Sequence, residues 1–259
     1  MSRVLITGCS TGIGRATAAH LATRGHDVVA TARRVDDLAG LDVVLRLPLD
    51  VTDPSSVAAV ADAAGDVEVL VNNAGILALG PVESFPLDEV RRLYETNVFG
   101  AMSMMQAFAP SMRARRSGTI VNVSSIAGQV VPPLMGAYAS TKFALEALSE
   151  AAALELSRFG VRVRVIQPGS VSSGALDDPV VHLDGAGAYA PLAGRGPGSD
   201  PASMTTPEAV AEAIADAIAS TGSDLRWPVG PAARLLEARR SMDDAAFAAT
   251  FRSLFAPDW

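Results

Sequence analysis

The fold of this chain is decided near its N-terminus by the stretch Thr7-Gly8-Cys9-Ser10-Thr11-Gly12-Ile13-Gly14. A short apolar run at residues 3–7 leads into this stretch, and residues 13–24 have helical composition. Glycine lets the backbone approach a ligand closely, and the first turn of a helix presents unpaired N–H groups to negative charge. A plain glycine-rich turn is the alternative. Three glycines within eight residues, between a strand and a helix, instead favour a turn that binds the phosphates of a nucleotide.

Strand and helix patterns alternate beyond this turn. Apolar runs typical of strands lie at residues 27–32, 43–49, 67–72, 119–124 and 161–167, and helical segments lie at residues 54–64, 87–116 and 138–159. Continuous apolar strands separated by helices are typical of a parallel sheet that is covered on both faces. We therefore predict an α/β fold, a Rossmann-like doubly wound parallel sheet with helices on both faces, in one domain spanning residues 1–259.

The C-terminal third has a different texture. Residues 170–206 are rich in Gly, Pro, Ser and Ala without clear periodicity, and a segment this long is more often functional than an inert connection. We predict a substrate loop or lid there, and a C-terminal extension of the same domain at residues 207–259. Phe247, Phe251, Leu254 and Phe255 recur at helical spacing. This spacing favours a packed amphipathic helix over one that lies on a membrane surface.

Composition excludes several classes of protein. The 259 residues are 49% hydrophobic and 19% charged, which suits one packed core. The net charge of −7 and the lack of a long basic cluster argue against nucleic acid as a partner. A single cysteine, Cys9, cannot form an internal disulfide, and no Cys/His spacing resembles a metal site. No apolar run resembles a signal peptide or approaches the roughly 18 residues of a membrane span. We expect a soluble cytoplasmic protein.

A pair of side chains on one predicted helix suggests acid–base chemistry. Tyr138 and Lys142 are four residues apart and therefore neighbours on one helix face. The pKa of a free tyrosine is about 10, and a nearby ammonium lowers it toward the working range. Ser125 follows a strand at the carboxyl edge of the sheet, where ligands bind in such folds. A chance pair on an exposed helix face is the alternative, but the glycine turn and Ser125 favour catalysis. Cys9 has no histidine nearby and is interpreted as structural.

The order of the motifs resembles the short-chain dehydrogenase/reductase family, and most closely its branch of 17β-hydroxysteroid and retinol dehydrogenases. The resemblance covers residues 3–169 and rests on the glycine turn, Asn72-Asn73-Ala74-Gly75, Asn97, Ser125, Tyr138, Lys142 and Pro168-Gly169. Family spacing places twelve residues between the serine and the tyrosine, which selects Ser125 over Ser124. Ser124 would point to the opposite side if the strand continued.

The resemblance implies an oxidoreductase that transfers a hydride between a nicotinamide cofactor and a carbonyl or secondary alcohol. It implies that Tyr138 is the general acid/base, that Lys142 lowers its pKa and binds the nicotinamide ribose, that Ser125 orients the carbonyl, and that Asn97 supports a water-linked proton relay. It also implies a homodimer or homotetramer. The cofactor-binding residues that we predict are Gly8, Ser10, Thr11, Gly12, Ile13, Gly14, Arg33, Asp50, Val51, Asn73, Ala74, Gly75, Tyr138, Lys142, Pro168, Gly169, Val171 and Ser173.

The residues after the second strand indicate which cofactor binds. An acidic residue there would hydrogen-bond the adenosine ribose of NAD, whereas arginine accommodates the 2′-phosphate of NADP. Arg33 and Arg34 follow the strand at residues 27–32, and the first carboxylates come later at Asp36 and Asp37. We predict a preference for NADP(H), with NAD(H) as the alternative because exposed arginines after strands are common.

The substrate is less clear from the sequence than the cofactor. Ser173 takes the place of a threonine that contacts the nicotinamide carboxamide in many family members. Leu134, Met135, Val180, Leu183 and Tyr189 are expected near the pocket and favour an apolar small molecule. Two alternatives stay open: a catalytically silent NADP(H)-binding sensor or scaffold, and an enzyme with a narrow substrate range.

Overall fold

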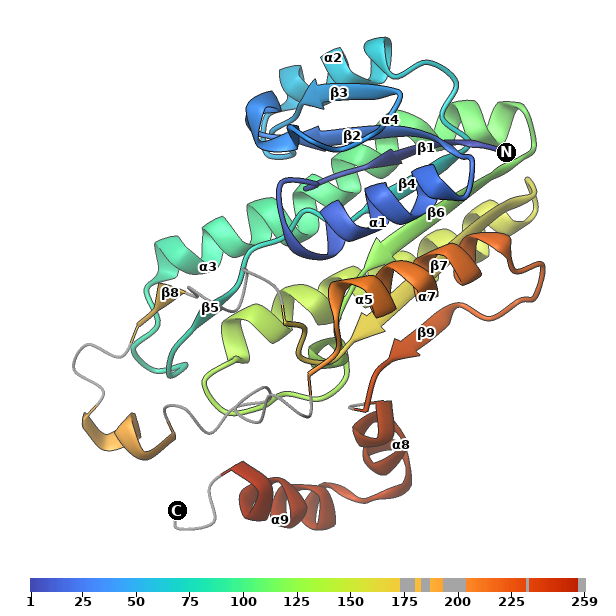
Figure 1. Ribbon diagram of the computed structural model, residues 1–259. Helices are drawn as coiled ribbons and strands as arrows, with labels where there is room; N and C mark the ends of the chain where they lie inside the picture. Colours follow the sequence, from blue (N-terminus) through green and yellow to red (C-terminus); the bar gives the residue numbers. More distant parts are fainter. Residues whose placement is uncertain (173–179, 183–186, 193–203, 232, 256–259) are drawn as a thin grey trace.

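Seven parallel strands form the centre of this computed structural model, which describes residues 1–172, 180–182, 187–192, 204–231 and 233–255 (Figure 1). The strand order is β3-β2-β1-β4-β6-β7-β9. The sheet contains β1 (Arg3–Ile6), β2 (Asp27–Ala32), β3 (Leu45–Pro48), β4 (Val69–Asn72), β6 (Gly118–Val123), β7 (Val161–Pro168) and β9 (Arg226–Val229). A separate parallel pair joins β5 (Ala78–Leu79) to β8 (Val180–Val181).

Helices connect and cover these strands. The longer helices in the described part are α1 (Gly12–Thr23), α2 (Pro54–Ala63), α3 (Leu87–Tyr94), α4 (Ala101–Ala114), α5 (Gly136–Ser157), α7 (Pro207–Ala219), α8 (Ala233–Ser241) and α9 (Asp244–Phe255). The short helical segments are η1 (Val35–Leu38), the π-helical η2 (Glu95–Gly100), η3 (Ile126–Gly128) and η4 (Gly187–Leu192).

The sheet has a hydrophobic core on each face. Val4 and Ile6 of β1 belong to the core that contains residues of α1 and α7, and Leu5 belongs to the core that contains residues of α2 and α4. Side chains of α5 pack against this second core. Successive residues of a strand point to opposite faces, so one apolar strand serves both cores. The predicted doubly wound parallel α/β fold is confirmed.

The N-termini of α2 and α1 differ in whether a side chain caps them. Pro54 occupies the first turn of α2, and the Asp53 side chain caps that helix by accepting a hydrogen bond from Ser55 N at 2.9 Å. At the start of α1, by contrast, the Thr11 side chain makes no capping hydrogen bond. The first N–H groups of α1 are therefore left for a ligand.

The elements differ from the sequence-based expectations in several places, including the bounds of β4 and α5. The strand expected at residues 43–49 is shorter, because β3 spans only Leu45–Pro48. The helical segment at residues 87–116 is divided into α3, η2 and α4. The tail forms two helices rather than one, and Phe251 of α9 is buried with Leu236 of α8 against Ile126 and Val130. That contact satisfies the apolar face that the sequence predicted, and Figure 1 shows both helices beyond β9.

Much of the segment at residues 170–206 lies outside the described residues, including Ser173 and Leu183 of the predicted site. Its described parts include β8, which pairs with β5, and a bridge between Val171 and Thr205 that joins the two ends of the segment. Across the ranges that the structure describes, no helix is long and apolar enough to cross a membrane.

Candidate active site

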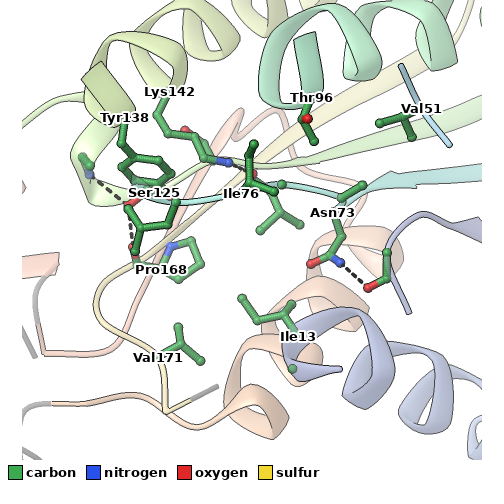
Figure 2. A pocket seen from close by; sticks show the side chains of 18 of the residues that line it. Ile13, Val51, Asn73, Ile76, Thr96, Ser125, Tyr138, Lys142, Pro168 and Val171 are labelled. Atoms are coloured by element: carbon green, nitrogen blue, oxygen red, sulfur yellow. Dashed lines mark hydrogen bonds between the residues drawn. The ribbon is translucent and has the colours of Figure 1, made fainter. Parts of the chain in front are cut away.

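A cavity of about 710 Å³ lies along the carboxyl ends of the central strands. Figure 2 shows Tyr138, Lys142 and Ser125 together on one side of it and Ile13 and Asn73 on the other. The predicted residues that line this cavity are Gly8, Ser10, Thr11, Gly12, Ile13, Arg33, Asp50, Val51, Asn73, Ala74, Gly75, Ser125, Tyr138, Lys142, Pro168, Gly169 and Val171. The fold therefore brings together residues that are far apart in the chain.

One predicted glycine, Gly14, lies behind the cavity rather than in its wall. Gly14 is buried under the turn, where a Cβ atom would overlap the carbonyl oxygen of Gly8 and lie 2.5 Å from Asn73 Nδ2. Gly8 has a φ of +74°, which glycine adopts without strain. The turn thus closes tightly because these two positions have no side chain.

Hydrogen bonds fix the glycine turn to the end of β4. Asn73 Nδ2 donates to the carbonyl oxygens of Thr7 at 2.9 Å and Gly8 at 3.1 Å. The Thr7 hydroxyl accepts from the backbone N–H groups of Asn73 at 3.0 Å and Ala74 at 2.9 Å. The result is a preformed cradle beside the uncapped start of α1. Such a cradle suits the diphosphate of a dinucleotide, so these residues fit the cofactor that the sequence predicts.

Cys9 takes no part in the cavity wall. Its thiol is fully buried and donates to the carbonyl oxygen of Ile6 at 3.3 Å. Burial raises the pKa of Cys9 to about 12, so the thiol is protonated at neutral pH. A protonated, buried thiol is a poor nucleophile, which agrees with a structural role.

The two arginines after β2 have different surroundings. Arg34 donates to the Asp37 carboxylate at 2.6 Å, and this hydrogen bond lowers the pKa of Asp37. Arg33 lines the cavity, is exposed, and makes no hydrogen bond or ion pair with the described part of the chain. Arg33 is therefore the cation at this end of the cavity that is free to bind an anion.

Ser125 lies immediately after β6 and begins η3. Its hydroxyl accepts a hydrogen bond from Ala127 N at 3.1 Å and lies 3.4 Å from the carbonyl oxygen of Pro168, to which it donates. Ser124 also lines the cavity, and its backbone N–H donates to the carbonyl oxygen of Ile166 at 2.8 Å, so pairing with β7 continues one residue beyond β6. The Ser124 side chain is buried with its Oγ near Gly128, whereas the Ser125 hydroxyl interacts with Tyr138.

Tyr138 and Lys142 face the cavity from α5, one helical turn apart. Lys142 is buried, donates from Nζ to the carbonyl oxygen of Val123 at 2.9 Å, and lies 5.8 Å from the centre of the Tyr138 ring. The helix therefore directs the ammonium toward the strand that leads to Ser125. This is the arrangement that the four-residue spacing predicts.

Electrostatics at this end differ from the expectation. Tyr138 is half-buried at the cavity wall, and the partial desolvation of its phenol raises its pKa to about 12, although a hydrogen bond with the Ser125 side chain opposes the rise. Burial lowers the pKa of Lys142 to about 8, and the nearby Glu146 carboxylate opposes that fall. The sequence predicted a Tyr138 pKa that Lys142 lowers. Here the desolvation of the phenol outweighs any such effect.

Asn97 belongs to η2, the π-helical turn between α3 and α4. Its Nδ2 donates to the carbonyl oxygen of Ile76 at 2.9 Å and to Thr141 Oγ1 at 3.1 Å, and its Oδ1 accepts from Ile76 N at 2.8 Å. Asn97 is buried and does not line the cavity. The Asn97 side chain thus connects the segment after β4 to helix α5. Its place on a π-helical turn is also typical of functional sites.

Sequence reasoning missed part of the cavity wall. The additional lining residues are Ala32, Leu49, Thr52, Ile76, Leu77, Arg92, Glu95, Thr96, Val123, Ser124, Ile126, Ala127, Pro132 and Ser170. Most of them adjoin a predicted residue in the sequence, which is the signal that could have marked them, whereas Arg92 and Pro132 adjoin none. Of the residues expected near the substrate, Met135 lines the cavity, whereas Leu134, Val180 and Tyr189 do not. Val180 instead pairs with β5 and is exposed.

Comparisons with known proteins bear on what this cavity does. The family model of short chain dehydrogenases matches residues 2–180. Over 179 residues the chain is 40% identical to a 3-ketodihydrosphingosine reductase from Bacteroides thetaiotaomicron, covering 68% of this chain and 66% of that protein. It is 37% identical over 182 residues to retinol dehydrogenase 8 from Bos taurus, covering 65% of this chain and 58% of that protein. These matches span somewhat less than two thirds of the relatives' length.

A solved structure extends the similarity to nearly the whole chain. A short chain dehydrogenase from Burkholderia cenocepacia, determined in complex with NADP, matches with a TM-score of 0.81 and 25% identity. The match covers 96% of this chain and 97% of that one.

Proposed function

Because this chain belongs to the short-chain dehydrogenase/reductase family, we propose that it is an NADP(H)-dependent oxidoreductase that interconverts an apolar carbonyl and the corresponding secondary alcohol. The observation that carries the proposal is a single cavity that reaches from the glycine turn to Tyr138, Lys142 and Ser125. One end suits a diphosphate, and the other presents a proton donor beside a cation. A nicotinamide cofactor supplies the hydride when it is bound.

The roles of the side chains follow from their protonation states. Reduction of a carbonyl requires a proton at its oxygen, and Tyr138, with its pKa raised to about 12, carries that proton at neutral pH. Ser125 can donate a second hydrogen bond to the same oxygen, giving up its long contact to Pro168. After the proton leaves, the Lys142 ammonium stabilises the phenolate. Asn97 supports this site by holding Ile76 and Thr141, and the relay role that we expect for it would run through that region.

The preference for NADP(H) rests on Arg33. This guanidinium is free while Arg34 is engaged by Asp37, and a planar guanidinium pairs well with a phosphate. NADH lacks the 2′-phosphate that would meet Arg33. The structure of the Burkholderia relative with NADP is consistent with this preference.

An apolar substrate is supported by the wall around Tyr138. The lining residues that follow Ser125 and precede Tyr138 are Ile126, Ala127, Pro132 and Met135. None of these four carries a charge, so a charged substrate would find no partner among them. The names of the two relatives, 3-ketodihydrosphingosine reductase and retinol dehydrogenase 8, fit a substrate of this class.

Further expectations belong to the same proposal. We infer that residues 1–259 act as one domain in the cytoplasm, that residues 170–206 contribute to substrate specificity, and that the protein assembles as a homodimer or homotetramer. Intact Ser125, Tyr138 and Lys142 favour an active enzyme over a silent sensor or scaffold.

A carbonyl panel tests the proposal. NADPH oxidation is followed with apolar ketones and aldehydes of increasing chain length, and NADPH affinity is measured by calorimetry in parallel. The parent should turn over at least one member, and Tyr138→Phe should bind NADPH but lose turnover. Tight binding without oxidation across the panel would favour the silent alternative.

A further inference from the structure

A buried carboxylate lies one helical turn beyond Lys142. Glu146 of α5 is 5% exposed, and its two carboxylate oxygens accept hydrogen bonds from two different strands, β7 and β9. Oε1 accepts from Gln167 Nε2 at 2.9 Å, and Oε2 accepts from Arg226 Nε at 2.8 Å. The second arm of Arg226 reaches the exposed Glu150 at 2.6 Å. Arg226 of β9 thus binds two carboxylates on successive turns of α5.

Attachment of α5 to β9 does not explain why Glu146 is charged. Taking an ionised carboxylate out of water costs several kcal/mol, and well-packed apolar side chains often serve as well as a buried ion pair. Arg226 already joins the two elements through Glu150 at the surface. A negative charge at position 146 is therefore not needed to hold α5 against β9, which indicates a second role for it.

Glu146 also contacts the turn that follows Ser125. A Cβ atom on Gly128 would lie 2.9 Å from Glu146 Cγ, 3.0 Å from Ser124 Oγ and 3.2 Å from the carbonyl oxygen of Lys142. The absence of a side chain at residue 128 thus lets η3 rest directly on this part of α5. Glu146 is in contact with the turn that presents Ser125 and is a helix-face neighbour of Lys142.

The titratable and charged groups near Lys142 come from several elements. From α5 they are Glu146, Glu150 and the phenol of Tyr138, from β9 Arg226, and from α3 and η2 the cavity-lining Arg92 and Glu95. The neighbouring groups after β6, Ser124 and Ser125, and Gln167 of β7 are neutral. Glu146 opposes the fall in the Lys142 pKa that burial causes, and Arg226 is not among the causes of that shift.

We propose that Glu146 is a positioning residue for the proton-transferring pair, with its carboxylate keeping Lys142 charged beside Tyr138 and Arg226 keeping that carboxylate in place. The use of this charge in catalysis rests on the proposed function. The coupling of Glu146 to Lys142 does not rest on it.

The composition of the chain offers a direct test, because Lys142 is its only lysine. Incorporation of lysine labelled with ¹³C at Cε gives one side-chain resonance, whose shift with pH reports the protonation of Lys142. Spectra are recorded on the full chain with and without NADP⁺. Glu146→Gln should lower the midpoint of this titration by about half a pH unit or more, because the neutral amide no longer stabilises the ammonium.

Glu150→Gln is the matched control. It removes the same chemical group from the same helix and the same arginine, but at an exposed position one turn further from Lys142. Its midpoint should stay within about 0.2 of the parent value. If Glu146→Gln does not fold, the double variant Glu146→Gln/Arg226→Gln removes the buried carboxylate together with its half-buried arginine partner and should lower the midpoint in the same way. An unchanged midpoint in the folded charge-neutral variant would overturn the proposal.

Kinetics provide a second readout. In alcohol oxidation the rising limb of kcat with pH should move to higher pH in Glu146→Gln, with KM within about twofold, because a less charged Lys142 lowers the Tyr138 pKa less. Glu146→Asp keeps the negative charge, so the rising limb of its kcat profile should lie close to that of the parent. Rising limbs at the same pH in Glu146→Gln and Glu150→Gln would count against the proposal. A parent that oxidises no alcohol and reduces no carbonyl would instead contradict the proposed function, and the titration would still decide the role of Glu146.

Discussion

Replacement of Arg33 by alanine tests the cofactor preference most sharply. Arg33 is exposed at the cavity wall after β2 and has no partner in the described part of the chain, so its removal disrupts no internal contact. The fold and the glycine turn should therefore be unaffected. The variant isolates the interaction between one guanidinium and the 2′-phosphate.

The size of the effect follows from the exposure of the site. A hydrogen bond to a charged group contributes about 1.5–3 kcal/mol, which corresponds to about 10- to 150-fold in affinity. Water and salt screen an exposed pair, so the lower end applies. We expect the Kd for NADPH to rise about tenfold in Arg33→Ala, and the Kd for NADH to stay within about twofold.

The assay is titration calorimetry with both cofactors at two salt concentrations. Arg34→Ala is the control, because Arg34 is engaged by Asp37, and it should raise the Kd for NADPH less than about threefold. The difference between the two variants should shrink at high salt. Equal losses for NADPH and NADH in Arg33→Ala, or a larger loss in Arg34→Ala, would refute the reasoning.

Three further predictions concern the scaffold of the site. Gly14→Ala places a methyl group against the carbonyl oxygen of Gly8, so the free energy of unfolding measured in urea should fall by about 1–3 kcal/mol. The variant should also lose NADPH binding, and an unaltered Kd for NADPH would contradict the tight turn. Asn97→Ala leaves the N–H and C=O groups of Ile76 without their side-chain partner, so the free energy of unfolding should fall by about 1–3 kcal/mol, and an unchanged urea midpoint would argue against this clamp. Burial lowers the pKa of Lys142 from 10.5 to about 8, so between these values the unfolded chain binds the proton that the folded protein has lost. Stability should therefore rise with pH across that window, and Lys142→Met should lack the rise when both proteins are unfolded in urea at several pH values; parallel curves would contradict the assignment.

The fold was predictable because its signals are local. Apolar strands such as the one that became β2, and the glycine turn at Gly8, each reveal their conformation within a few residues. The pair Tyr138 and Lys142 was predictable for the same reason, since four residues make one helical turn. Alternation of such units leaves few ways to build a parallel sheet.

The remaining features depend on contacts between distant parts of the chain. The difference between Arg33 and Arg34 is an exception, because it comes from a local ion pair that Arg34 forms with Asp37 three residues later. The pair of Glu146 and Arg226 joins residues 80 positions apart. Tertiary burial likewise sets the pKa of Tyr138, and the spacing to Lys142 led to the opposite expectation.

The cavity wall shows a similar division. Residues of the motifs were found from their order, whereas the cavity-lining Glu95 and Thr96 belong to η2, a π-helical segment that no local pattern predicted. β3 is likewise shorter than the apolar run that predicted it. Strand ends and helix irregularities are set by tertiary packing, which a single sequence reports poorly.

Transfer of deuterium tests the central claim most directly. NADPH that carries deuterium at the transferable position of its nicotinamide ring is incubated with the protein and an apolar ketone, and the alcohol is analysed by mass spectrometry. The cavity that joins the glycine turn to Tyr138 and Lys142 predicts an alcohol one mass unit heavier with the parent and none above background with Tyr138→Phe, although that variant still binds NADPH. Labelled alcohol formed equally well by Tyr138→Phe would contradict the role of Tyr138 as the proton donor.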